Sequence, residues 1–523
     1  MSSSMSGEIN ALGHQLNVLS ERNRRSRDFT LNSLIHAIRE IIACFPVYRT
    51  YISPASDEPP PDRDRIYIRL AVARAVQRNP ALSNLVFDFI RDLLLKAPQE
   101  LAVLDWDSLR PFVLKFQQTT SPVTAKGVED TAFYIFNRLT SLNEVGGEPQ
   151  HFGLSLETFH HLMQERAGQW PHSLSATSTH DTKRSEDVRA RLNVLSEIPK
   201  EWRQRLRLWS RLNKKARQTL EDQTVPNANE EYLIYQTLLG IWPLTSLKQD
   251  TRSQILDRMK TYIIKALREA KENSSWLNPD EPYESAVLSF LDKILDMRPD
   301  NKFFQDFLSF HSRIAPSGIY NSLSPVLLKI TAPGIPDFYQ GTEPWDFTLV
   351  DPDNRRPVDY PTHQQQFDSL QSRLEGEDRS TLVAQLLEMP FDGTLKLFLT
   401  TETLKFRNAH PALFLHGNYH PLQITGDHAL HVCSYRRSLE PDHCLIVFPR
   451  LLTGLKLELT QLPVGEPVWG QTWLNLPPDL QIQTWRNVFT QQPLTLQKQS
   501  NMIGLPISTI FQHFPFALLE PVL

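Results

Sequence analysis

The chain has 523 residues, with 55 Lys and Arg against 59 Asp and Glu, so its formal net charge is −4. This near balance gives no general reason to expect nucleic acid or an anionic membrane as a partner. No apolar run approaches the length of a bilayer span, and the first residues lack the pattern of a signal peptide. The three cysteines have no metal-ligand spacing and are typical of reduced thiols. We therefore expect a cytoplasmic protein of several domains.

The first 110 residues have the apolar periodicity of helices. Leu31, Leu34, Ile38 and Ile41 recur at three- and four-residue spacing, which is typical of one buried helix face. The Pro-rich residues 53–62 predict a loop, and a further helix is expected over residues 65–77.

The next segment predicts a short strand at residues 113–116, followed by a polar loop at residues 117–122. In residues 125–134, Glu129 and Asp130 are adjacent and would diverge by about 100° on a helix, which makes them a poor catalytic pair. A place at a helix N-terminus suits both carboxylates. Lys126 is a better candidate for contacting a substrate, and Tyr134 either stacks on a substrate or packs in the core.

A His-Asp pair follows a short predicted strand at residues 174–178. Such a dipeptide alone is usually structural, but here polar groups of both charge signs crowd into a few residues. A carboxylate held beside a histidine can bind neighbouring sugar hydroxyls, and these hydrogen bonds strengthen as the sugar ring flattens toward an oxocarbenium ion. His180 and Asp181 are therefore candidates for a sugar site. Lys183 either orients Asp181, binds a hydroxyl or is an ordinary surface lysine.

Residues 190–310 predict a block of helices. Two apolar stripes support it: Trp202, Leu206 and Trp209, and then Ile255, Met259, Ile263 and Leu267. A short apolar run at residues 326–330 then predicts a strand whose following Pro-Gly turn carries Asp337, Tyr339 and Gln340. Polar residues after a strand are typical of the site edge of a β/α barrel. Residues 337–357 fit a binding loop and an acidic turn with helix caps equally well, and residues 351–356 also fit an internal salt-bridge network.

After about residue 385 the pattern favours β structure. Residues 428–436, 444–449 and 455–459 are short, strand-like and separated by turn residues. Trp469, Trp473 and Trp485 are expected in the core of a sandwich.

Several long segments resemble one known family, the maltooligosyl trehalose synthases of the α-amylase superfamily. The segments are KGVEDTAFY, LNEVGGEP, STHDTKRSEDVRARL and PGIPDFYQGTEPWDFTLVDPDNRRPVDY. The resemblance implies an α/β plus all-β fold: a partial (β/α)8 barrel with large helical insertions and a C-terminal β-sandwich. The expected parts are a helical segment 1–110, barrel strands and loops 111–190, a helical insertion 191–312, the last barrel strand and helix 313–384, and the sandwich 385–523.

The resemblance also implies an activity. Family members rearrange the reducing-end α-1,4 bond of a maltooligosaccharide into an α,α-1,1 bond, with no metal or organic cofactor. Asp181 corresponds to the carboxylate that stabilises the transition state, and His180 binds substrate beside it. Lys126, Lys183 and Tyr339 are candidates for holding the released glucose, and Tyr134, Asp337 and Gln340 complete the expected substrate-binding set.

Family members use an aspartate nucleophile and a glutamate acid/base from earlier barrel strands, and neither motif is found here. We therefore expect that the N-terminal part of the catalytic barrel is missing, and that this chain alone is incomplete. It is either one half of a split enzyme, completed by a second polypeptide, or a truncated reading frame. The alternative is a non-catalytic α-glucan-binding remnant. The expected partner is a maltooligosaccharide or α-1,4-glucan, with no nucleic acid and no membrane.

Overall fold

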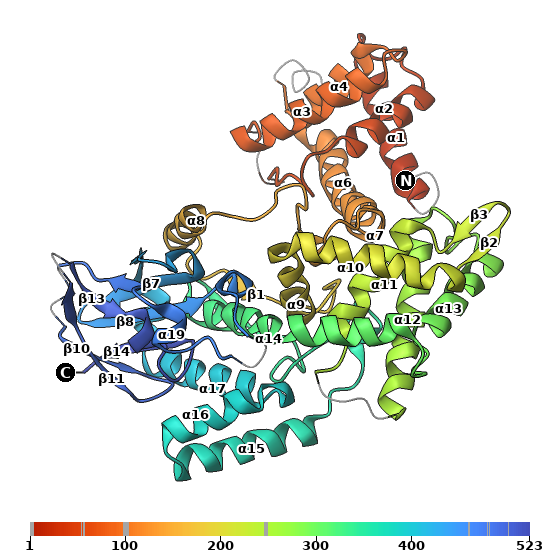
Figure 1. Ribbon diagram of the computed structural model, residues 1–523. Helices are drawn as coiled ribbons and strands as arrows, with labels where there is room; N and C mark the ends of the chain where they lie inside the picture. Colours follow the sequence, from red (N-terminus) through yellow and green to blue (C-terminus); the bar gives the residue numbers. More distant parts are fainter. Residues whose placement is uncertain are drawn as a thin grey trace. The chain divides into compact units, whose positions relative to one another are not determined.

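The computed structural model describes residues 5–53, 55, 58–97, 104–244, 249–458, 461–478, 480, 482–499 and 502–522. The chain forms two compact units, Met1–Ile135 and Phe136–Leu523. Figure 1 shows helices throughout the first unit, and helices together with small sheets in the second. Among the described residues, no helix is long and apolar enough to cross a membrane.

The first unit is built from helices around one apolar core. They are α1 (Ser6–Glu21), α2 (Leu31–Ala43), α3 (Asp62–Arg78), α4 (Asn84–Leu94), α6 (Trp106–Thr124), a π-helix (Ala125–Ala132) and the short α7 (Phe133–Ile135). The predicted helices at residues 31–41 and 65–77 are confirmed as α2 and α3. Thr30 caps α2 by accepting the backbone N–H of Ser33 at 3.2 Å, which satisfies one of the free donors at the helix start.

The strand predicted at residues 113–116 is wrong, and so is the polar loop predicted at residues 117–122. Both lie in α6, whose Asp105 cap accepts the backbone N–H of Ser108. Leu109, Phe112, Val113 and Phe116 are buried at helical spacing, and this longer pattern outweighs the short apolar run. The prediction took a helix face for a strand.

The second unit contains a parallel pair of strands that positions the candidate site. After α8 (Leu156–Gln169), strand β1 (Leu174–Ala176) pairs with β4 (Ile335–Asp337), with Ala176 opposite Asp337. The strand expected at residues 174–178 is confirmed over residues 174–176. Because parallel strands end at the same edge, the loops with His180-Asp181 and Tyr339-Gln340 start side by side.

In the described residues between the two strands, the structure has six α-helices. They are α9 (Glu186–Glu197), α10 (Pro199–Leu212), α11 (Ala228–Ile241), α12 (Gln249–Ala270), α13 (Glu281–Ile294) and α14 (Lys302–Thr331), with a hairpin of β2 (Gln218–Leu220) and β3 (Gln223–Val225) between α10 and α11. The predicted helical block is thus confirmed, apart from the hairpin. Trp202 and Trp209 are buried among aromatic side chains of α14, and the stripe on α12 is buried as well.

The strand predicted at residues 326–330 is also wrong, because these residues form the last turns of α14. Val326, Leu327 and Ile330 are buried, since α14 packs against α9 and α17 (Thr394–Ala409). A helix covered on several sides presents a continuous apolar run, which cannot be told from a buried strand by its pattern alone.

Helices continue well past residue 385. They are α15 (Tyr360–Gly376), α16 (Arg379–Glu388), α17 and α18 (Pro411–His416), so the β region begins at Asn418 and not at 385. Residues 455–458 are not a strand, and Leu459 lies outside the described residues. The strand predicted at 428–436 begins only at Val432. The one predicted at 444–449 is confirmed.

The C-terminal strands form two antiparallel sheets (Figure 1). The first has the order β11-β10-β14-β8-β7-β5 and the second β12-β13-β9-β6. Their bounds are β5 Asn418–Pro421, β6 Gln423–Thr425, β7 Val432–Leu439, β8 Asp442–Pro449, β9 Trp473–Asn475, β10 Thr484–Asn487, β11 Pro493–Thr495, β12 Gln497–Gln499, β13 Met502–Pro506 and β14 Ala517–Pro521, with the short helices α19 (Glu466–Trp469) and α20 (Ile507–Ile510) between them. Trp469 and Trp485 are fully buried, as expected, whereas Trp473 is partly exposed.

Candidate active site

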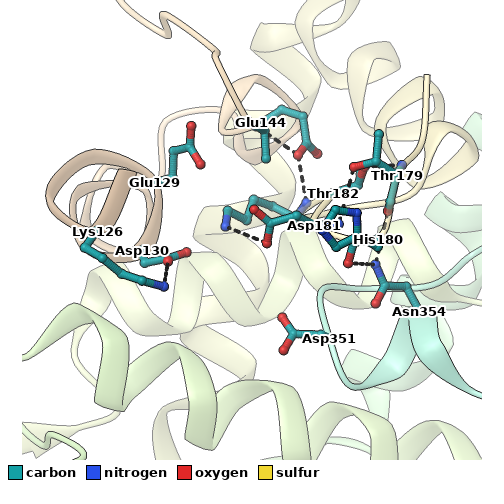
Figure 2. A network of polar contacts seen from close by, with 12 residues as sticks. Lys126, Glu129, Asp130, Glu144, Thr179, His180, Asp181, Thr182, Asp351 and Asn354 are labelled. Atoms are coloured by element: carbon teal, nitrogen blue, oxygen red, sulfur yellow. Dashed lines mark hydrogen bonds and ion pairs between the residues drawn. The ribbon is translucent and has the colours of Figure 1, made fainter. Parts of the chain in front are cut away.

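A tight turn after β1 presents the His-Asp pair. The Thr182 hydroxyl accepts the backbone N–H of Thr179 at 2.7 Å, and the Thr179 hydroxyl accepts the N–H of Asp181 at 3.3 Å. These bonds satisfy the backbone of the turn locally, as threonine hydroxyls commonly do. The Asp181 side chain is 49% exposed, and His180 is exposed beside it (Figure 2). The turn therefore offers a carboxylate and an imidazole to a ligand.

Lys183 lies beside this carboxylate, although little of it is in contact with solvent. Its Nζ is 3.7 Å from Oδ1 of Asp181, and its side chain is only 4% exposed. The interpretation of Lys183 as an ordinary surface lysine is therefore wrong. A buried ammonium next to a half-exposed carboxylate restricts the orientation of that carboxylate.

Glu144 holds the backbone that follows Asp181, and sequence reasoning assigned it no role. Its Oε1 accepts the backbone N–H of Lys183 at 2.8 Å, and its Oε2 accepts that of Arg184 at 3.2 Å (Figure 2). Arg189 lies 3.6 Å from the same carboxylate. Charge-assisted bonds to backbone N–H groups are among the stronger hydrogen bonds. Glu144 belongs to the segment LNEVGGEP, and the family resemblance of this segment is the feature of the sequence that could have pointed to a role for Glu144.

The loop after β4 holds the turn from the other side. Asn354 donates its Nδ2 hydrogens toward the carbonyl oxygens of His180, at 3.2 Å, and Thr179, at 3.4 Å (Figure 2). The Tyr339 hydroxyl in turn donates to the carbonyl oxygen of Asn354 at 3.0 Å. Tyr339 thus supports the loop through its backbone. Asp337 and Gln340 are both exposed at the edge where β4 ends.

The acidic turn at residues 351–356 is a salt-bridge network. Arg258 of α12 donates to both carboxylate oxygens of Asp353, at 2.9 and 2.8 Å. Lys265 of the same helix lies 2.7 Å from the Asp351 carboxylate. This confirms the interpretation of this turn as an internal network that holds the loop in place.

A buried ionic cluster anchors the segment that follows the turn. Lys396 of α17 lies 2.7 Å from Glu186 and 2.8 Å from Asp187, at the start of α9. The backbone N–H of Asp346 donates to Asp187 at 2.7 Å. Burial, together with the charge of Asp187, raises the pKa of Asp346 to about 7. Lys329 of α14 completes the cluster at 3.5 Å from Glu186.

Two candidates lie in the first unit, on the π-helix and just after it. Lys126 is exposed and pairs with Asp130 at 2.5 Å, four residues on. Tyr134 is buried, which agrees with packing more than with stacking on a substrate. Glu129 is also buried and accepts a hydrogen bond from the Tyr48 hydroxyl, so it does not serve an exposed helix N-terminus.

Within the part of the chain that the structure describes, no group of three or more His, Cys, Asp or Glu residues could hold a metal ion. The described cysteines, Cys44, Cys433 and Cys444, are buried and unbridged.

Comparison with known proteins agrees with the resemblance seen in the sequence motifs. No protein-family model matches the chain. A Mycobacterium tuberculosis protein named as a maltooligosyl trehalose synthase is 36% identical over 359 residues, which is 68% of this chain and 41% of that protein. The chain therefore spans less than half the length of this curated relative.

Solved structures extend the similarity to nearly the whole chain. The maltooligosyltrehalose synthase of Arthrobacter ramosus matches with a TM-score of 0.75 and 29% identity, over 99% of this chain and 56% of that chain. A Sulfolobus tokodaii protein described as a hypothetical maltooligosyl trehalose synthase matches with a TM-score of 0.63 and 26% identity, over 97% of this chain and 58% of that one.

Proposed function

Since the chain is related in sequence and fold to the maltooligosyl trehalose synthases, we propose that it supplies part of the site for an intramolecular transglycosylation. The reaction converts the reducing-end α-1,4 bond of a maltooligosaccharide into an α,α-1,1 bond. The observation that carries the proposal is the half-exposed Asp181 carboxylate, presented at a strand end with the Lys183 ammonium 3.7 Å away.

In this proposal Asp181 hydrogen-bonds sugar hydroxyls, and these bonds strengthen as the ring gains oxocarbenium character. His180 is exposed next to it and contacts the same sugar. Lys183 and Glu144 keep the carboxylate in place, so that little reorganisation is needed when charge develops. Lys126, Tyr134, Asp337, Tyr339 and Gln340 remain candidates for substrate contacts, and Tyr134 is the weakest because it is buried.

A change of linkage without hydrolysis also requires that the released glucose stays bound while water is excluded. The nucleophile and the acid/base are part of the proposal too, because a retaining transfer needs both on opposite sides of one bond. The proposal assigns neither group to a residue of this chain, and a second polypeptide with further barrel strands is one source of both. The β1–β4 pair would then belong to a partial (β/α)8 barrel, α9 to α13 to its helical insertion, and the two C-terminal sheets to a β-sandwich.

The test is to incubate the purified chain with maltopentaose and to follow reducing ends and free glucose. Loss of reducing ends without matching glucose release, by the chain alone or after a polypeptide with the missing strands is added, supports the proposal. Maltopentaose that binds but is never turned over under either condition favours the alternative, a glucan-binding remnant. A chain that neither binds nor converts maltopentaose contradicts both.

A further inference from the structure

A large cavity in the second unit lies between α12 and the loop at residues 350–356. Its volume is about 920 Å3, and its wall includes Trp276 from the segment after α12. This volume is at the upper end of the range of small-molecule sites, roughly 300–1,000 Å3. The cavity contains neither Asp181 nor His180, so the function proposed above does not explain it.

The charges around the cavity favour a neutral ligand. Four acidic and four basic side chains line it, and its most enclosed charges already pair with one another, Arg258 with Asp353 and Lys265 with Asp351. Such a wall has no excess charge to attract a phosphate or a cation. It does offer many hydrogen-bonding groups, among them the exposed Asp257 and the half-buried Glu269.

Asp351 remains an acceptor in this wall. Burial raises the pKa of Asp351, but the hydrogen bond and charge of Lys265, with the charges of Arg355 and Lys183, outweigh burial and hold the pKa below its usual value. An ionised carboxylate accepts hydrogen bonds from hydroxyl groups.

Trp276 adds a flat apolar surface to these polar groups. Its side chain is 52% exposed, and the Arg268 guanidinium lies 5.1 Å from the centre of its ring. Arg268 is itself fixed by two bonds of 2.8 Å to Glu284. The indole is thus supported by Arg268 while much of its surface remains free. A ring of this kind, next to fixed hydrogen-bonding groups, suits a sugar, which has apolar C–H faces and a hydroxyl edge.

The cavity adjoins the candidate active site through one loop. Asp351 lines the cavity, whereas Asn354 of the same loop binds the carbonyl oxygen of His180 (Figure 2). The charge of Lys183, next to Asp181, also acts on Asp351. We propose that this cavity is a second carbohydrate subsite, which binds glucose units of an α-1,4-glucan away from the bond that is rearranged. The inference rests on the proposed function, because one glucan chain would occupy both this cavity and the site at Asp181.

The experiment compares binding of maltoheptaose and maltotriose to the full chain by isothermal titration calorimetry. Trp276→Ala and Glu269→Ala alter the cavity, while Trp170→Ala removes another exposed tryptophan, 68% exposed against 52% for Trp276, that does not line it. We expect Trp276→Ala to weaken maltoheptaose binding about tenfold. Glu269→Ala should weaken it less. Maltotriose binding and the Trp170→Ala variant should be unchanged.

The outcomes separate this inference from the proposed function. If maltoheptaose binds the unaltered chain and both cavity variants with one affinity, the subsite is refuted while the proposed function stands. If Trp170→Ala weakens binding as much as Trp276→Ala, the loss does not come from the cavity, and the inference also fails. An unaltered chain that binds neither sugar contradicts the proposed function together with the subsite.

Discussion

The two carboxylate oxygens of Glu144 accept the backbone N–H groups of two consecutive residues, Lys183 at 2.8 Å and Arg184 at 3.2 Å. One side chain thus fixes the backbone directly after Asp181. Glu144 and Lys183 are 39 positions apart in the chain. The support that Glu144 gives to this backbone therefore forms only when these two parts of the second unit have come together.

Glu144→Gln should loosen this turn. Both oxygens act as acceptors, so an amide must direct its NH2 group at one of the two backbone N–H groups. We expect a loss of about 1–3 kcal/mol in the free energy of unfolding, and faster hydrogen exchange at residues 182–185. Glu148→Gln is the control, because Glu148 is exposed and its carboxylate lies 2.7 Å from the His151 ring, away from the turn. Equal exchange rates in both variants would refute the role of Glu144.

Lys183→Ala should change the products more than the fold. Without the ammonium near Asp181, the released glucose is held less firmly, and water competes for the glycosyl group. In a mixture that converts maltopentaose, we expect a several-fold rise in the ratio of free glucose to trehalosyl product. Lys215→Ala, at an exposed position, serves as the control. An unchanged product ratio in Lys183→Ala would count against this role.

Asp346→Asn should change how stability depends on pH. The pKa of Asp346 is raised to about 7 in the folded state, so between pH 4 and 7 the folded chain keeps a proton that the unfolded chain releases. The wild type therefore loses stability relative to the variant as pH rises through this window, by about 4 kcal/mol at most. Chemical denaturation at several pH values measures this difference. Parallel stability curves for the two proteins would contradict it.

Gly334→Ala should disturb the β1–β4 pair. The φ angle of Gly334 is +123°, and a Cβ there would lie 2.9 Å from the carbonyl oxygen of Ser173 and 2.5 Å from the Ser175 hydroxyl. We expect a cost of about 2–3 kcal/mol in the free energy of unfolding. Gly168→Ala is the matched control, since a Cβ there meets nothing within 4 Å. It should be neutral or stabilising by up to about 1 kcal/mol. A Gly334→Ala variant as stable as this control would refute the close approach.

Sequence patterns predicted the elements well where a long periodic stretch was available. The stripe on α12 and the periodicity of α2 extend over three or more turns, and both are helices. The two wrong strands, at residues 113–116 and 326–330, were short apolar runs taken out of longer helices. A run of four or five apolar residues does not distinguish a buried helix turn from a buried strand.

The candidate site was predictable only as far as its local contacts. The pairing of Lys183 with Asp181 involves residues two positions apart, and orienting Asp181 is one of the three roles that the local sequence suggests for Lys183. The contacts of Glu144 and Asn354 with the same turn join residues 39 and 174 positions apart. The Asn354 contact brings the loop after β4 to the loop after β1, an arrangement that follows from the parallel pairing of these strands and that no local pattern specifies.

The ion pair between Asp187 and Lys396 spans 209 positions of the chain. Closing so long a loop is slow relative to local folding. During synthesis, the segment with His180 and Asp181 leaves the ribosome long before the lysine that anchors its end. The start of α9, directly after the turn at the candidate site, therefore gains this ion pair only after α17 has been made, and until then Asp187 lacks the Lys396 counter-ion.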